Sequence, residues 1–216
     1  MSPGWERSGA RQRLGAALAA LPLSPPPDAP GQLLDLCELL ATWAVRMSLT
    51  AHRTPDAILY RLVLDAAALG SVLPEAASIA DLGAGAGFPG LPLAVLFPER
   101  RFTLVEARER KHHFQREAVR RLGLANVRPL LGRSDELEPE PHEGAVAQAM
   151  ARPDRVLALL LPWAAEGGWL AVPGGAAAPP IDPPSGVGRT ELKRYRVPIT
   201  GLERTAWIGR RTAIPA

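Results

Sequence analysis

The sequence is poor in cysteine, lysine and aromatic residues: among 216 residues it has one cysteine, two lysines and 5% aromatic residues. A single cysteine, Cys37, excludes an internal disulfide framework and a cysteine-based metal cluster, and it is typical of a reducing compartment. The four histidines lack zinc-ligand spacing. No run of 18 apolar residues is present, so no membrane-spanning helix is predicted. We therefore expect a cytoplasmic protein with neither a metal centre nor a membrane span.

The overall composition is that of an ordinary globular domain. Hydrophobic residues make up 47% and charged residues 22% of the chain, which at this length predicts one main domain with a small helical appendage. The formal net charge is +3 and the isoelectric point about 9.6. Because arginine, alanine, proline and glycine are enriched along the whole chain, the high isoelectric point alone is a weak indication of nucleic-acid binding.

The first 72 residues are predicted to form an N-terminal helical extension. A helix is predicted over 9–21, followed by a stiff proline-rich connector over 23–31. Over 32–47 apolar residues recur at spacings of three and four, the period of one helix face. Thr54 as N-cap and Pro55 at the first helical position predict a third helix that ends near residue 69.

From residue 73 to residue 216, short apolar runs alternate with helical stretches. Their alternation is typical of a parallel sheet with helices on both faces. The segment 173–188, rich in proline, glycine and alanine, is predicted to be a mobile loop. The last two runs predict a closing antiparallel hairpin. The predicted strands are 78–82, 102–106, 127–131, 145–148, 169–172, 192–199 and 202–210, and the predicted helices are 91–96, 110–122 and 154–165.

The strongest chemical signal is the string DLGAGAGFPG after the first predicted strand. Asp81 can hold the amino-acid end of a ligand, directly or through water, and would repel a pyrophosphate. Glu106, at the end of the second strand, is placed to accept both ribose hydroxyls. This acidic pair favours S-adenosylmethionine (SAM). The glycine spacing alone also fits a dinucleotide site, which leaves a nicotinamide-dependent oxidoreductase open. Glycines let the backbone turn sharply and approach a ligand closely, and those concerned are Gly83, Gly85 and Gly87.

Three later positions complete the expected pocket. Ser134 or Asp135, after the third strand, could meet the amino group of an adenine, although Ser134 is read equally well as a helix N-cap. Gln148 ends the fourth predicted strand, at the sheet edge that would face a methyl group. Packing of the strand end is the alternative reading for Gln148.

The chain resembles the RsmG (GidB) methyltransferases from Leu14 to Arg210, and the string GFPGLP over 87–92 is the most specific part of the resemblance. The resemblance implies a Rossmann-like class I SAM-dependent methyltransferase: an α/β fold with a mostly parallel seven-stranded sheet and a C-terminal antiparallel hairpin, preceded by N-terminal helices. It implies that the cofactor is SAM and that the activity is methylation of guanine N7 in 16S rRNA of the small ribosomal subunit. Carried over by position, it implies cofactor contacts at Gly83, Phe88, Glu106, Ser134 and Asp135.

Four positions depart from the family's pattern. The family has arginine where this chain has Gln148 and lysine where it has Pro173, and usually asparagine and histidine where Ser48 and Leu62 stand. A second interpretation therefore stays open. In it, the chain is a divergent paralogue that binds SAM but methylates another RNA, or is a non-catalytic module that binds RNA or the ribosome.

Guanine N7 carries a lone pair and no proton, so its methylation needs alignment more than an acid or a base. We therefore assign no catalytic base. Few aromatic residues are available to stack on single-stranded bases, which favours a folded ribosomal particle over free RNA as the partner. We expect the protein to act as a monomer. Contact with RNA needs a basic surface beside the pocket, and the candidates are Arg108, Arg110, Lys111, Arg133 and Arg152.

Overall fold

A computed structural model of the chain describes residues 5–148, 150, 153–177 and 181–213. Its N-terminal part is helical, and side chains cap the N-termini of two of these helices by hydrogen bonding. The Glu6 carboxylate accepts hydrogen bonds from the first backbone N–H groups of α1, and the Thr54 hydroxyl accepts one from Ala57, which confirms Thr54 as the N-cap of α3. The elements are α1 (Arg7–Ala19), α2 (Ala29–Arg46), α3 (Pro55–Ile58), a π-helical segment (Leu59–Val63) and α4 (Leu64–Gly70).

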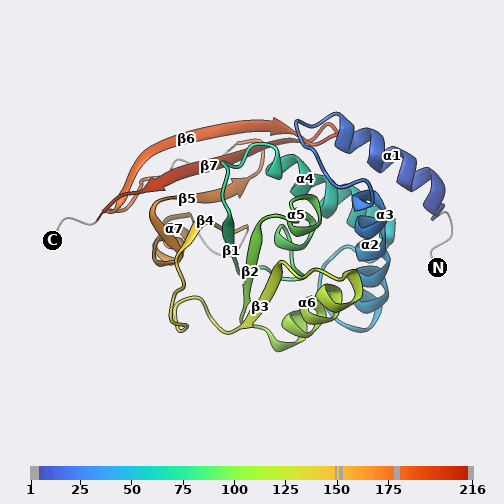
Figure 1. Ribbon diagram of the computed structural model, residues 1–216, viewed down its shortest axis with the longest axis horizontal. Helices are drawn as coiled ribbons and strands as arrows, with labels where there is room; N and C mark the ends of the chain where they lie inside the picture. The colour runs from blue at the N-terminus through green and yellow to red at the C-terminus, as the bar shows by residue number, and fades with distance from the viewer. Residues whose placement is uncertain (1–4, 149, 151–152, 178–180, 214–216) are drawn as a thin grey trace.

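Seven strands form one twisted sheet in the order β3-β2-β1-β4-β5-β7-β6 (Figure 1). The first five strands are parallel to one another, and β7 runs antiparallel to both β5 and β6. The predicted parallel sheet with a closing antiparallel hairpin is confirmed. In chain order the elements are β1 (Ser78–Leu82), α5 (Gly90–Leu96), β2 (Arg101–Glu106), α6 (Glu109–Leu122), β3 (Val127–Leu131), β4 (His142–Val146), α7 (Pro153–Leu160), a 3-10 turn (Leu161–Trp163), β5 (Ala164–Gly174), β6 (Val187–Arg196) and β7 (Glu203–Arg211).

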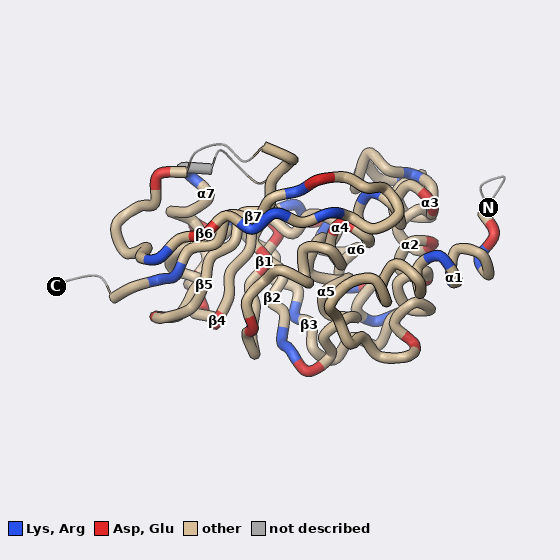
Figure 2. The backbone as a smooth tube through the Cα atoms, turned by 90° about the horizontal axis from the view of Figure 1, so that it is seen from above, with Lys and Arg blue, Asp and Glu red and all other residues tan. Residues whose placement is uncertain are grey.

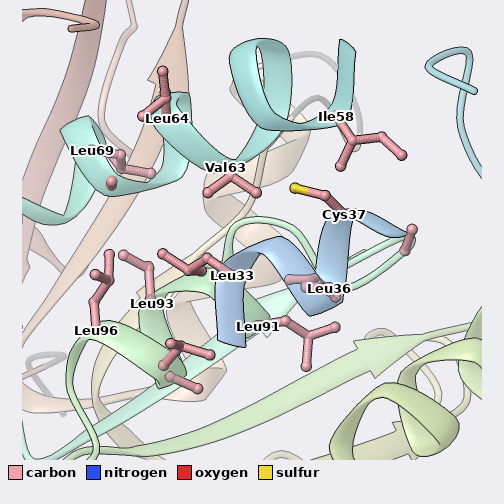
Figure 3. Close-up of a cluster of buried hydrophobic side chains, with 14 of the residues drawn as sticks. Leu33, Leu36, Cys37, Ile58, Val63, Leu64, Leu69, Leu91, Leu93 and Leu96 are labelled. Carbon is pink, nitrogen blue, oxygen red and sulfur yellow. The ribbon is translucent and has the colours of Figure 1, made fainter. Parts of the chain in front are cut away.

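Two hydrophobic clusters cover the two faces of the sheet. Along β1 the side chain of Ile79 belongs to one cluster, and those of Ala80 and Leu82 belong to the other, as the alternation of side chains along a strand requires. Figure 3 shows part of the larger cluster, where α2 lies between α5 and the helical segment over 55–70. Cys37 is fully buried there, and burial raises the pKa of its thiol far above the usual range, so it serves packing.

The N-terminal helices share this core with the sheet. Trp43 of α2 packs edge-on against Phe114 of α6, with ring centroids 5.6 Å apart. The helical extension and the α/β unit therefore form one continuous packed structure.

Proline explains two boundaries that differ from the prediction. α2 begins at Ala29, inside the expected connector, because Pro30 fits the first turn of a helix, where no N–H is needed. The helix predicted over 154–165 instead ends at Leu160. Pro162 has no N–H to continue the helix, and a 3-10 turn leads directly into β5.

Two further predictions about strand bounds were wrong. The segment 173–188 is not wholly a loop, because Pro173 and Gly174 end β5, where they pair with β7, and β6 begins at Val187. The fourth strand ends at Val146 rather than at 148. Gln148 therefore lies in a bend beyond the strand and not at its end.

Candidate cofactor site at the carboxyl edge of the sheet

The loop between β1 and α5 is a tight glycine turn. Gly83, Gly85 and Gly87 have φ values of +64°, +61° and +85°, in the region that only glycine enters readily. The turn closes on itself, because the backbone N–H groups of Gly87 and Phe88 both donate to the carbonyl of Ala84, at 2.8 and 2.9 Å. The predicted glycine turn is thus present at the carboxyl end of the first strand.

A Cβ at Gly83 would lie 2.6 Å from the sulfur of Met150, which follows β4. The backbone of Gly83 and the Met150 side chain therefore approach each other more closely than any other residue at position 83 would permit. Both residues line the cavity described below.

Glu106, at the end of β2, holds the glycine turn in place. Its Oε2 accepts a hydrogen bond from the backbone N–H of Gly85 at 2.8 Å, and its Oε1 accepts one from Arg108 at 2.8 Å. The side chain is 6% exposed. Each carboxylate oxygen has a second lone pair, so the group can still accept hydroxyl donors from a ligand.

Gln115 supports the same turn from beneath. It is fully buried on α6, and its Nε2 donates to the carbonyl of Gly85 at 2.8 Å. Its Oε1 is buried without a hydrogen-bond partner among the described residues. Sequence reasoning missed this residue, because nothing local relates a helical glutamine to a loop 30 residues earlier.

These segments enclose a cavity of about 560 Å³, within the range of roughly 300–1,000 Å³ typical of small-molecule sites. Four of the predicted cofactor residues line it: Gly83, Glu106, Ser134 and Asp135. Sequence reasoning did not single out several other lining residues, among them Val105, Ala107 and Leu159. Of the remaining predicted residues, Asp81, Gly85, Gly87, Phe88 and Gln148 do not belong to the described lining.

The loop after β3 forms the wall that was predicted to meet an adenine. The backbone N–H of Gly132 donates to the carbonyl of Glu106 at 3.0 Å, which joins this loop to the end of β2. Trp163 fixes it from below by donating from its indole N–H to the carbonyl of Ser134 at 3.1 Å. Arg133 binds Asp135 through two hydrogen bonds and lowers the pKa of that carboxyl group.

Asp81 lies below the glycine turn and is 1% exposed. Its Oδ2 accepts a hydrogen bond from the backbone N–H of Gly90 at 2.9 Å, while no described residue donates to its Oδ1. Burial, more than the nearby charge of Glu106, raises the pKa of Asp81 to about 7. A buried carboxylate with a free oxygen is a group that a cationic ligand can stabilise.

Gln148 lies outside the described lining of the cavity and contacts a different cluster, around Asp65. Arg204 of β7 donates from Nε to Oδ1 of Asp65 on α4 at 3.1 Å. Arg204 and Gln148 both favour the ionised form of Asp65, but desolvation is the larger effect and raises its pKa. Tyr195, opposite Arg204 in the hairpin, is half-buried beside the same carboxylate. Sequence reasoning identified only Gln148 in this cluster.

The predicted RNA-binding residues separate into two groups. Arg108, Lys111 and Arg133 line the cavity, together with Arg155 of α7. Arg110 is exposed on α6 outside the described lining, and Arg152 lies outside the described residues. Three predicted cations therefore lie at one opening.

Within the part of the chain that the structure describes, no cluster of three or more His, Cys, Asp or Glu residues is arranged to hold a metal ion. In the same residues, no helix is long and apolar enough to cross a membrane.

Comparison with known proteins assigns the chain to a family. The model of the GidB family, rRNA small subunit methyltransferase G, matches residues 30–180, which include the glycine turn and the cavity wall. The chain belongs to this family. The ribosomal RNA small subunit methyltransferase G of Chromohalobacter salexigens is 37% identical over 194 residues, covering 89% of this chain and 93% of that protein. Its counterpart in Photobacterium profundum is 30% identical, covering 87% and 92%.

Solved structures support the same fold for this GidB family member. The crystal structure of M. jannaschii TYW2 in complex with AdoMet superposes with a TM-score of 0.51 at 13% identity, covering 68% of this chain and 73% of that one. The fold is that of the class I SAM-dependent methyltransferases, as the family resemblance implied.

Proposed function

We propose that this protein transfers the methyl group of SAM to N7 of a guanine in the 16S rRNA of the small ribosomal subunit. The observation that carries the proposal is the cavity in which the left-handed turn at Gly83 meets the buried carboxylate of Glu106. The cavity lies within the segment matched by the rRNA small subunit methyltransferase G family. Membership of that family supports the choice of ribosomal RNA as the substrate.

The residues of the site suit SAM. Glu106 offers a buried acceptor for the two ribose hydroxyls, and the loop carrying Ser134 and Asp135 suits the adenine. Asp81 lies outside the described lining of the cavity, but its buried Oδ1 accepts no hydrogen bond from the described residues. Its carboxylate suits the ammonium of the amino-acid end, held directly or through water. The positions of Gly85, Gly87 and Phe88 in the turn shape that end of the site. When bound, SAM supplies an electrophilic methyl group on a sulfonium.

The chain's own contribution is to orient the guanine toward the methyl group and to exclude water from the site. Guanine N7 presents a lone pair and no proton, so no side chain has to remove one. Met150, packed against Gly83, provides an apolar wall beside the turn. Arg108 and Lys111 give the opening positive charge that suits a phosphate backbone.

Substitution of Gln148 can distinguish an active methyltransferase from the divergent paralogue considered above. Its amide lies beside Asp65, so that carboxylate has one arginine partner, Arg204, among the described residues. Restoring an arginine through Gln148→Arg gives Asp65 a second cation. An active enzyme is expected to gain turnover from this change, whereas a binding module is not. A nicotinamide cofactor is favoured by no observation beyond the glycine spacing.

The remaining expectations follow from the proposed substrate. A protein that modifies the small ribosomal subunit works in the cytoplasm, and we propose that it does so as a monomer. Analytical ultracentrifugation at micromolar concentration tests the oligomeric state.

The deciding experiment is methyl transfer from labelled SAM into 30S subunits that lack their native guanine-N7 mark. The product nucleoside is identified by mass spectrometry. Formation of 7-methylguanosine at a single site is the expected result. A folded protein that binds S-adenosylhomocysteine (SAH) but transfers no methyl group to these subunits contradicts the proposal. Gln148→Arg is assayed in parallel, and Gln12→Arg, the same substitution on the exposed surface of α1, is its control.

A further inference from the structure

The positive charge of the chain is concentrated in its last two strands. Seven of the 25 basic residues but only two of the 22 acidic residues fall within 187–211, the hairpin made of β6, its turn and β7. The hairpin therefore carries a formal charge of +5, while the rest of the chain carries −2. The net positive charge of the chain is thus carried by 25 of its 216 residues.

Much of this charge lies on an exposed sheet edge. β6 is the last strand of the sheet, and six consecutive residues, 189–194, are exposed, so side chains on both faces of the strand reach solvent. Figure 2 shows basic residues along both strands of the hairpin. Ten residues of β6 at roughly 3.3 Å per residue span about 33 Å. The edge is long enough to contact several nucleotides.

Several basic side chains of the hairpin form hydrogen bonds or exposed ion pairs, but these contacts cancel little of their charge. Lys193 and Arg196 pair with exposed glutamates, at 3.0 and 3.5 Å, and such pairs contribute little free energy. Arg194 and Arg210 donate to backbone carbonyls, which orients the guanidinium groups without cancelling their charge. Among the described residues, no carboxylate lies within 4.0 Å of Arg189.

The hairpin also leads to the candidate site. Its inner end is fixed by the ion pair of Arg204 with Asp65 beside Gln148, and Thr205 pairs with Gly174 at the carboxyl end of β5. From there β6 and β7 extend along one side of the molecule, away from the N-terminal helices and toward the C-terminus (Figure 1). A strand of RNA lying along β6 would continue toward the edge where the cavity opens.

We propose that the β6–β7 hairpin binds the phosphate backbone of ribosomal RNA and holds the substrate particle against the enzyme. This inference rests on the proposed function and adds a surface outside the cavity. The ordinary alternative is that the charges only keep an exposed sheet edge from pairing with other chains. The two interpretations predict different results when the basic residues of the hairpin are neutralised. RNA binding predicts a loss of RNA affinity, whereas edge protection predicts none.

The test compares two triple variants that remove the same charge. The hairpin variant is Arg189→Gln/Lys193→Gln/Arg194→Gln, and the control is Arg11→Gln/Arg53→Gln/Arg101→Gln, at exposed positions outside the hairpin. Binding to 30S subunits is measured by co-sedimentation over a series of salt concentrations. Binding of SAH and thermal unfolding report on the integrity of both proteins.

The hairpin variant is expected to bind 30S subunits at least tenfold more weakly than wild type at physiological salt. The slope of log K against log salt should become shallower by about 2 to 3, because each of three lost phosphate contacts contributes roughly 0.7 to 0.9. The control should stay within about twofold of wild type. Equal losses in the two variants, or no loss in either, overturn the proposal. So does charge-dependent binding to acidic lipid vesicles with none to 30S subunits.

The binding assay separates this inference from the proposed function. If wild type binds 30S subunits through the hairpin but transfers no methyl group, the hairpin surface stands and the catalytic proposal fails. If methyl transfer proceeds with an unchanged KM for subunits in the hairpin variant, the enzyme stands and the hairpin proposal fails.

Discussion

The carboxylate of Glu106 lies 2.8 Å from the backbone nitrogen of Gly85 and accepts its hydrogen bond. This contact joins the ends of two neighbouring parallel strands, since Glu106 ends β2 and Gly85 follows β1. The group proposed to hold the ribose is therefore the same group that shapes the glycine turn. Loss of this carboxylate should therefore disturb the binding of the ribose and of the amino-acid end together.

Glu106→Gln is expected to weaken binding of SAH by roughly 10- to 100-fold, because hydrogen bonds to a charged group contribute about 1.5–3 kcal/mol. The measurement is isothermal titration calorimetry. Glu143→Gln is the matched control, since Glu143 also accepts a backbone N–H, that of Ala77, but at the opposite edge of the sheet. Comparable weakening in both variants would contradict the role of Glu106.

Gly83 and Gly123 offer a matched pair of left-handed glycines, with φ values of +64° and +65°. Alanine at either position costs about 1–2 kcal/mol of backbone strain. Only at Gly83 does the added Cβ meet a neighbour, the sulfur of Met150 at 2.6 Å, whereas nothing lies within 4 Å of one at Gly123. Gly83→Ala should therefore lose SAH affinity, and Gly123→Ala should lose only stability. Thermal unfolding with and without SAH measures both, and retained affinity in Gly83→Ala would refute this account.

Much of the fold could be predicted because its signals are local. The period of apolar residues located α2, and the proline after Thr54 located the start of α3. The prediction that 173–188 is a loop was wrong in part because it rested on amino-acid composition, which reports on side chains and not on the pairing of the backbone. Pro173 and Gly174 are ordered by backbone pairing with Ala206 and Thr205, which lie about 30 residues later in the sequence.

The sequence predicts those site residues that lie at strand ends. It does not predict those that reach the site through the packing of distant elements. Gly83 directly follows β1 and Glu106 is the last residue of β2, so their placement at one sheet edge follows from parallel topology. Gln115 reaches the turn from α6, 30 residues after Gly85, and Arg204 reaches Asp65 across 139 positions. No spacing rule relates such residues, because the sheet and its crossovers bring them together.

The ion pair of Arg204 with Asp65 should matter for stability, unlike the exposed pair formed next to it. The side chains of Arg204 and Asp65 are 25% and 10% exposed, whereas those of Arg196 and Glu203 are 72% and 69% exposed. Arg204→Gln leaves a largely buried carboxylate without its cation and should cost on the order of 2 kcal/mol. Arg196→Gln should cost less than about 0.5 kcal/mol. Urea unfolding compares the two, and Arg204→Gln/Asp65→Asn should recover part of the loss. Equal costs would exclude a special role for the buried pair.

The pKa of Asp81 sets a pH dependence that can be isolated by substitution. Burial raises this pKa from 3.8 to about 7 in the folded protein. Between these values the folded state keeps a proton that the unfolded state has lost, so stability falls as pH rises, by up to about 1.4 kcal/mol per pH unit. Above pH 7 both states are ionised and the effect levels off. The difference in unfolding free energy between wild type and Asp81→Asn, measured in urea from pH 4.5 to 8, should follow this course.

Cofactor affinity should change in the opposite direction, because the ammonium of SAH prefers the ionised carboxylate. SAH binding to wild type should strengthen as pH rises toward 7, by up to tenfold per unit, and then level off. In Asp81→Asn it should be weaker at pH 7.5 and independent of pH over this range. Glu106 raises the pKa of Asp81 through its charge, so Glu106→Gln should shift the midpoint to lower pH. A wild-type affinity that does not vary between pH 5.5 and 7.5 would remove Asp81 from the proposed site.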